Sequence, residues 1–285
     1  MSSITPLTPQ LAAWEAEIKL GFMHLNGHTL LTEKVHHGPL RVQKALYPEG
    51  REVCQAILLH PPSGIAGGDH LHIAAHVGAQ AHAQLTTPGA GKWYRSSGVE
   101  ASQTLDFTVA DNGILEWLPQ ETIIFDGALS RMNTQVQLGE GSRYFGWEIL
   151  CLGRSASGER FDHGSIHLHT RIERQGQALW LERGQLTGHD PMLASQVAWA
   201  GASVGGTLMA TLSPGINVAA LLEACRAIAP NDGAEHALTV LPGLLFARYL
   251  GHHSEAARLW FIQLWQVLRP VLLGRPALPP RIWNT

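Results

Sequence analysis

The sequence has little charge: Asp, Glu, Lys and Arg make up only 15% of its 285 residues, whereas they make up about 25% of an average soluble protein. Disordered chains combine high charge with low hydrophobicity, and the 45% hydrophobic content excludes that class. The formal net charge is −3, so the chain lacks the basic surplus that duplex-binding proteins carry. A surface with so few charges is typical of proteins that partners cover.

Cysteine and long apolar runs are scarce as well. Cys54, Cys151 and Cys225 lie far apart and form no CxxC pair, which excludes a disulfide framework and a metal knuckle. The longest apolar stretch, residues 259–273, contains Gln, Arg and Pro and is too short and too polar to span a bilayer. The N-terminus has no basic segment followed by an unbroken apolar one, as a secretory signal would. We therefore expect a soluble, cytoplasmic protein.

The familiar nucleotide-binding motifs are absent. The glycine-rich residues 60–69 lack both the Lys-Ser/Thr of a P-loop and the GxGxxG pattern. We predict that this segment is a tight loop that needs positive φ at some of its glycines and whose end is capped by Asp69. The pattern G-x-S-x-G occurs once, at residues 201–205, but the predicted strand 205–212 follows it and not the helix of a nucleophile elbow, so serine hydrolase chemistry has no support.

Short strands fill most of the chain before residue 200. Residues 14–20 alternate apolar and polar side chains, which is the period-2 pattern of a half-buried strand. The predicted strands are residues 14–20, 28–36, 40–46, 53–60, 70–77, 81–87, 102–109, 113–118, 121–125, 132–138, 144–152, 165–174 and 178–186. This series predicts a mainly β fold with a large, multi-stranded assembly. No repeat of fixed period is present, which argues against a recognisable solenoid family.

The C-terminal third changes character. After a strand at 205–212, we predict a helix over residues 216–229, two strands at 237–241 and 244–250, and a second helix. That helix begins with Ser254 as its N-cap and stops near Pro270. We expect this β-α-β-β-α segment, about residues 205–270, to form a layer on the β body. Because no linker separates the two parts, residues 14–285 are predicted to form one domain after a flexible tail, residues 1–13.

Histidines and carboxylates supply the candidate chemistry. His70, His72 and His76 share a parity on one predicted strand and therefore project from one face. Such imidazoles either chelate an ion such as Zn²⁺ or Ni²⁺, or form a solvated polar face. Several carboxylates interrupt apolar strands, and each points outward or is buried with a partner or a metal. They are Glu116, Glu121, Asp126, Glu148 and Glu182.

A set of ordered motifs resembles one known family. The pattern HPPxGIxGGD at residues 60–69 is followed by LTTPGAxKxYRS at residues 85–96. The segments LEWLPQETI at 115–123, LCLGR at 150–154 and LPPRIW at 278–283 continue the match to the end of the chain. Together they resemble the UreD family of urease accessory proteins, also called UreH.

The resemblance implies a long, layered, helix-like β assembly with two helices and no catalytic activity. Such a scaffold docks on apo-urease with the helical accessory protein UreF and, through UreF, the nickel GTPase UreG. It holds no tightly bound cofactor, and nickel passes through an internal tunnel. By motif position and chemistry, the candidate nickel path is Asp69, Thr86, Thr87, Glu121, Glu148 and Glu182. The alternative function is a metal-dependent hydrolase that uses the face of His70, His72 and His76 with a nearby carboxylate base.

The last predicted helix is apolar almost all round. A helix that faces a core on one side needs an apolar stripe of about 100°, and Ile262 and Trp265 fall outside that stripe. We therefore predict that one face packs on the sheet and that Ile262 and Trp265 contact a partner. The alternative is that the helix is wholly internal to the chain.

Overall fold

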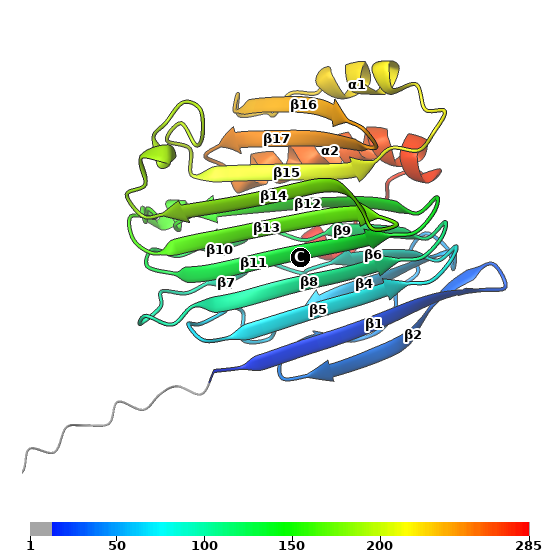
Figure 1. The fold of residues 1–285 in the computed structure, drawn as a ribbon, viewed down its shortest axis with the longest axis horizontal. Helices are drawn as coiled ribbons and strands as arrows, with labels where there is room; N and C mark the ends of the chain where they lie inside the picture. Colours follow the sequence, from blue (N-terminus) through cyan, green and yellow to red (C-terminus); the bar gives the residue numbers. More distant parts are fainter. Residues whose placement is uncertain (1–12, 285) are drawn as a thin grey trace, which may run out of the picture.

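A computed structural model describes residues 13–284 of the chain, so the predicted tail, residues 1–13, falls almost wholly outside the described residues. Two β-sheets face each other in this structure (Figure 1). The first sheet has seven strands. In spatial order they are β14 (Gln177–Thr187), β13 (Ser165–Arg174), β11 (Leu129–Leu138), β8 (Ala101–Val109), β5 (His70–Val77), β1 (Glu15–Leu25) and β2 (His28–His37).

The second sheet has ten strands. Its main path runs β16 (Glu235–Leu241), β17 (Leu244–Gly251), β15 (Val204–Thr211), β12 (Arg143–Leu152), β9 (Ile114–Leu118), β6 (His82–Thr86), β4 (Val53–Leu59) and β3 (Arg41–Val42). Beside that path, β10 (Thr122–Ile124) pairs with β12 and with β7 (Gly91–Trp93). The two helices, α1 (Val218–Arg226) and α2 (Ser254–Leu273), both lie in the C-terminal third, and the fold is mainly β as predicted.

The central strands form a solenoid-like coil. Strands β1, β5, β8, β11 and β13 are parallel in the first sheet, and β4, β6, β9 and β12 are parallel in the second. The chain alternates between the sheets, so each turn of the coil contributes one strand to each. The first-sheet strands of successive turns begin at residues 70, 101, 129 and 165. Because the turns differ in length, the coil leaves no repeat of fixed period in the sequence. The absence of such a repeat argued against a recognisable solenoid family, but it is compatible with this solenoid-like coil.

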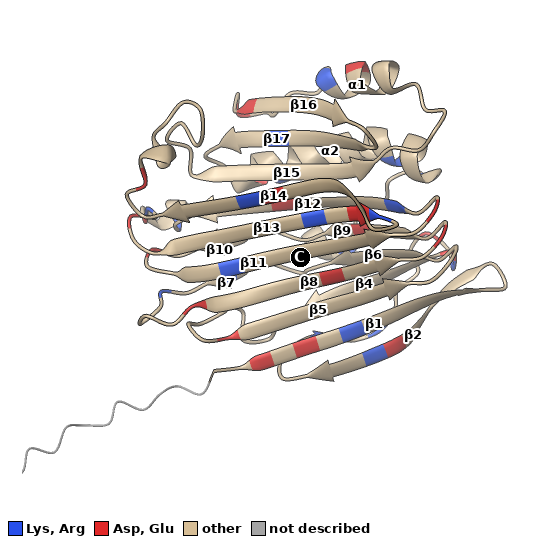
Figure 2. Cartoon of the chain, in the orientation of Figure 1, with Lys and Arg blue, Asp and Glu red and all other residues tan. Residues whose placement is uncertain are grey.

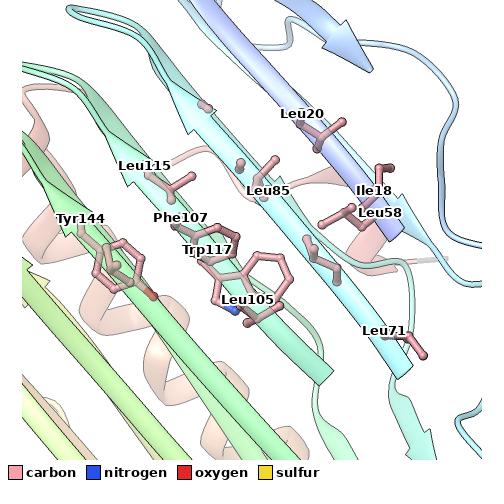
Figure 3. Packing of buried hydrophobic residues seen from close by; sticks show 14 of the residues in the cluster. Ile18, Leu20, Leu58, Leu71, Leu85, Leu105, Phe107, Leu115, Trp117 and Tyr144 are labelled. Carbon is pink, nitrogen blue, oxygen red and sulfur yellow. The ribbon is translucent and has the colours of Figure 1, made fainter. Parts of the chain in front are cut away.

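Two hydrophobic layers hold the sheets and helices together. The first lies between the sheets, where the side chains labelled in Figure 3, including Ile18, Leu85, Phe107 and Trp117, are buried. The second lies between the ten-stranded sheet and the helices and contains four tryptophans, Trp147, Trp260, Trp265 and Trp283. The order from one side to the other is therefore sheet, core, sheet, core, helices.

Most predicted strands are present, and the main differences lie in two short segments. Of the predicted strand 40–46, only Arg41–Val42 forms a ladder, antiparallel to the end of β4, and Leu46 makes a single bridge to Gln55. In the loop that follows β6, residues Gly91–Trp93 form a short strand beside β10.

Helix α2 departs from its prediction at both ends. The N-cap residue is His253, without a side-chain capping bond, and Ser254 is the first helical residue. The helix continues through Pro270 to Leu273, where Gly274 at φ 73° donates its N–H to the Pro270 carbonyl. A proline inside a helix usually costs about 3 kcal/mol. Here burial of Leu272 and Leu273 against the second core offsets that cost.

Charged residues are spread thinly over the outer strands. Figure 2 shows single Lys, Arg, Asp and Glu positions along the seven-stranded sheet rather than one block of either sign. Within the described part of the chain, no helix has the length and apolarity needed to cross a membrane.

Candidate functional site

A cavity of about 740 Å³ lies between the two sheets. Its walls extend from His60, just after β4, across β9 and β12 to Arg248 on β17. Five strand spacings separate β4 from β17 in the ten-stranded sheet, which corresponds to roughly 24 Å. The cavity therefore runs across the strands as a channel-like space rather than along one strand.

Polar side chains from both sheets meet near the β17 end of this cavity. In the first sheet, Thr134 pairs in register with Thr170, and Thr170 pairs with Glu182. In the second sheet, Glu148 pairs with Thr207, which pairs with Arg248. All six residues line the cavity. Because a strand alternates its side chains, each sheet brings three polar groups into an otherwise apolar interior.

Two hydrogen bonds connect these rows across the cavity. The Thr134 hydroxyl donates to Glu148 Oε1 at 3.1 Å. In the second bond, Arg248 Nη2 donates to Glu182 Oε1 at 2.9 Å. Within the second sheet, Arg248 Nη1 also donates to the Thr207 hydroxyl at 2.9 Å. The polar cluster therefore links the two sheets by hydrogen bonds, and it places two carboxylates and one guanidinium around the same space.

The two carboxylates differ in environment. Burial raises the pKa of Glu148, and the nearby Glu182 charge raises it further, whereas the Thr134 hydrogen bond and Arg248 lower it. Glu182 is less enclosed, with 35% of its side chain exposed, and forms its ion pair with Arg248. The cavity therefore holds one buried carboxyl group whose pKa is raised and one partly exposed carboxylate that pairs with a guanidinium.

The other end of the cavity carries His60, Thr87 and Gln120. His60 Nε2 is buried without a hydrogen-bond partner in the protein, and so is the indole nitrogen of Trp117, another wall residue. Burial lowers the pKa of His60, which favours the neutral imidazole. Buried polar atoms of this kind are usually satisfied by water. This end of the cavity therefore suits hydrated ligands better than apolar ones.

Three of the six predicted nickel-path residues line this cavity: Thr87, Glu148 and Glu182. The Thr87 hydroxyl accepts a hydrogen bond from the Gln120 backbone N–H at 2.9 Å and donates to the Gly89 carbonyl at 3.2 Å. Its oxygen thus belongs to the turn that follows β6 as well as to the cavity wall.

Asp69 is a cap of the glycine-rich loop, as predicted. Its carboxylate accepts hydrogen bonds from the backbone N–H groups of Trp14 at 3.0 Å and Ala66 at 2.8 Å. Gly68 adopts φ 93° and Ser63 adopts φ 60° in the same loop. Asp69 is buried, but it is not among the residues that line the cavity.

Thr86 and Glu121 also lie outside the cavity wall. Thr86 is fully buried, and its hydroxyl donates to the Leu118 carbonyl at 2.6 Å and accepts the Trp283 indole N–H at 2.8 Å. Burial raises the pKa of Cys151, a residue of the core on the helix side, and the charge of Glu121 raises it further. Thr86 therefore connects the sheet to the helix layer, and Glu121 lies near the same core.

The predicted partner residues on α2 have different surroundings. Trp265 has no exposed surface, and its indole N–H donates to Glu116 inside the second core. Ile262 is partly buried at the edge of that core. Leu259 and Val271 are the exposed apolar side chains of the helix. Any contact between α2 and a partner therefore involves this outer face and not the Trp265 ring.

The histidine face predicted on residues 70–77 exists on the outer side of β5. His72 lies between two carboxylates, with Nε2 2.7 Å from Asp106 and Nδ1 3.2 Å from Glu17. His70 is hydrogen-bonded to Ser102. Among residues 13–284, no group of three His, Cys, Asp or Glu side chains is arranged to hold a metal ion. Nothing in this arrangement favours the hydrolase alternative.

Glu116 is an in-strand carboxylate that is buried with protein partners and does not point outward. It is completely buried and receives both Nε and Nη2 of Arg269 at 2.9 Å, the Trp265 indole at 2.8 Å and His82 Nε2 at 2.8 Å. Arg269 also pairs with Glu49 and donates to the Pro276 carbonyl. This network fixes α2 and the segment after it onto the sheet.

Several cavity residues were not predicted. His60 stood in a quoted motif but was treated as part of a loop, and Arg248 and Thr134 carry no motif at all. Their role depends on which strand positions face each other across the two sheets, and local alternation does not contain that information. The polar interruptions in apolar strands were the usable signal, and they identified Glu148 and Glu182.

Known proteins are similar to this chain over nearly its whole length. The family model described as UreD urease accessory protein matches residues 15–284. The urease accessory protein UreD of Dechloromonas aromatica is 62% identical over 274 residues, covering 96% of this chain and 95% of that protein. The UreD proteins of Nitrosococcus oceani (50% over 273 residues, 96% and 91% covered) and Azoarcus sp. (48% over 285 residues, 100% and 99%) are also similar. The chain therefore belongs to the UreD family of urease accessory proteins.

Proposed function

We propose that this urease accessory protein is a non-catalytic cytoplasmic scaffold that guides nickel to apo-urease through the cavity between its sheets. Thr87, Glu148 and Glu182 supply oxygen ligands along the wall. Ni²⁺ is borderline in softness and accepts oxygen and imidazole ligands. Dispersed ligands of this kind bind an ion weakly, which suits a path better than a store.

The observation that carries this proposal is the polar lining of an enclosed space. Glu148 lines one end of the cavity, and the His60 and Trp117 nitrogens elsewhere on its wall have no protein partner. An apolar core excludes polar groups that lack partners because their desolvation is costly. A hydrated passage accounts for all three groups at once.

We also propose that the protein works in a complex with UreF, UreG and the urease subunits. Only 15% of the residues are charged, and exposed apolar side chains lie on and just after α2, at Leu259, Val271 and Leu278. Such side chains are typical of protein interfaces. The assembly would hold the end of the cavity against the site that receives nickel.

A blocked cavity tests the nickel path. Gly184 lies on the cavity wall with a backbone that tolerates a side chain, and an added Cβ would meet only Leu168, at 3.7 Å. Gly184→Leu should therefore fill part of the channel without strain, whereas Gly184→Ala is the matched control. We expect co-expression of Gly184→Leu with the urease operon to lower urease nickel content several-fold, with the complex still formed.

The measurement is metal content and activity of purified urease, together with pull-down of UreF. Wild-type nickel loading by a folded Gly184→Leu variant would contradict the cavity as the path. Loss of both nickel and partner binding, with Gly184→Ala equally affected, would assign position 184 to folding instead.

A further inference from the structure

Arg248 is the unexpected group in a cavity proposed to carry a cation. Its guanidinium lines the cavity and is held by Glu182 at 2.9 Å and by Thr207 at 2.9 Å. An arginine is always protonated in a protein. A fixed positive charge at this place would repel Ni²⁺, unless the side chain moves when the ion arrives.

The local charge balance shows what Arg248 does in the resting protein. Its guanidinium pairs with the Glu182 carboxylate, and the nearby Glu148 carboxyl is buried and accepts a hydrogen bond from Thr134. Arg248 therefore neutralises the Glu182 charge, and without Arg248 that carboxylate would be available to a divalent cation.

The geometry points to Arg248 as a built-in competitor that occupies the Glu182 carboxylate, gives way to Ni²⁺, and returns to displace the ion. This inference rests on the proposed function of the cavity. Arg248 is a positioning residue in this scheme and does not bind nickel itself. The exchange involves no covalent step: one carboxylate changes its cationic partner.

The exposure of the pair supports reversible exchange. In the Arg248 side chain 44% of the surface is exposed, and in Glu182 35%. Ion pairs with this exposure are weak because water competes for both groups. Arg248 can therefore leave Glu182 for solvent. The fully buried pair of Arg269 with Glu116 has no such route.

The test measures nickel binding directly. Calorimetric titration of the full-length chain, kept soluble by a carrier fusion if needed, uses Ni²⁺ alone as the probe. Removal of a neighbouring like charge changes ligand affinity by about tenfold or more, so Arg248→Gln should bind Ni²⁺ at least about tenfold more tightly than wild type. Arg248→Lys keeps the charge and should bind like wild type. The double variant Glu182→Gln with Arg248→Gln should lose the gain.

Urease activation gives the second readout. Arg248→Gln should lower nickel transfer to co-expressed urease while the protein itself retains more nickel, a combination that a merely structural role would not produce. Unchanged Ni²⁺ affinity in Arg248→Gln, or an equal gain in Arg248→Lys, would overturn the inference. If Arg248→Gln and Arg248→Met both lose the folded circular dichroism signal, Arg248 is a structural tie and the inference fails. Failure of the cavity proposal itself is seen separately, as normal nickel loading by Gly184→Leu.

Discussion

Replacement of Glu116 by Gln should destabilise the protein more than loss of any exposed ion pair. Glu116 is fully buried and accepts two hydrogen bonds from Arg269, one from Trp265 and one from His82. Gln keeps the shape but removes the charge, which leaves Glu49 as the remaining carboxylate partner of the Arg269 guanidinium. Removal of one partner from a buried ion pair typically costs about 3–5 kcal/mol.

The pKa of Glu116 gives a second route to the same magnitude. Although desolvation opposes ionisation, His82 and Arg269 lower its pKa from 4.5 to about 2. A displacement of that size corresponds to roughly 3 kcal/mol of stabilisation by the ionised form. Because the folded-state pKa is below the unfolded one, this stabilisation is complete above about pH 4.5. It is lost as the pH falls toward 2.

Urea unfolding followed by tryptophan fluorescence measures the effect, since Trp265 contacts Glu116 directly. We expect the free energy of unfolding of Glu116→Gln to fall by about 3 kcal/mol at pH 7 and to depend less on pH below 4.5 than that of wild type. Glu100→Gln is the control, because its pair with Arg131 is exposed and should contribute at most about 1 kcal/mol. Equal, small losses in the two variants would refute the reasoning.

Three further outcomes follow from the contacts of the predicted site residues. Thr86→Val leaves the Trp283 indole and the Leu118 carbonyl without their partner, so thermal unfolding should show a loss of about 1–3 kcal/mol; a melting temperature equal to that of wild type would contradict that. Asp69→Ala removes the acceptor of two backbone N–H groups, so hydrogen exchange in residues 60–69 should accelerate, and unchanged protection would show that the carboxylate is dispensable. Trp265→Ala should lower the free energy of unfolding by about 3–5 kcal/mol because the Trp265 ring has no exposed surface. Ile262→Ser should instead weaken pull-down of UreF with a smaller loss of stability, and intact pull-down would exclude Ile262 from the interface.

Local sequence patterns predicted strands well and their partners not at all. The strands at 70–77 and 165–174 coincide with β5 and β13 because alternation and turn residues mark both ends. The parallel pairing of β5 with β8 depends on contacts more than twenty residues apart. Residues on separate sheets, such as Thr134 and Glu148, meet only after that pairing is set.

The end of α2 shows a different limit. Pro270 is a reliable local stop signal, and the prediction followed it. The helix continues because Arg269, one residue earlier, is anchored by Glu116 and because Leu272 and Leu273 are buried. Tertiary packing outweighed the local preference, and the decisive partners lie far away in sequence.

The network around Arg269 has a consequence for biosynthesis. Arg269 lies 153 residues from Glu116 and 220 from Glu49, and Trp283 lies 197 residues from Thr86. Until residues 265–283 leave the ribosome, Glu116 has neither Arg269 nor Trp265, and the face of the ten-stranded sheet that α2 covers is exposed. Long-range contacts of this kind slow folding and prolong the exposure of apolar surface. The nascent chain therefore exposes apolar surface until α2 packs on the sheet. A variant truncated before Arg269 should keep that surface exposed and aggregate.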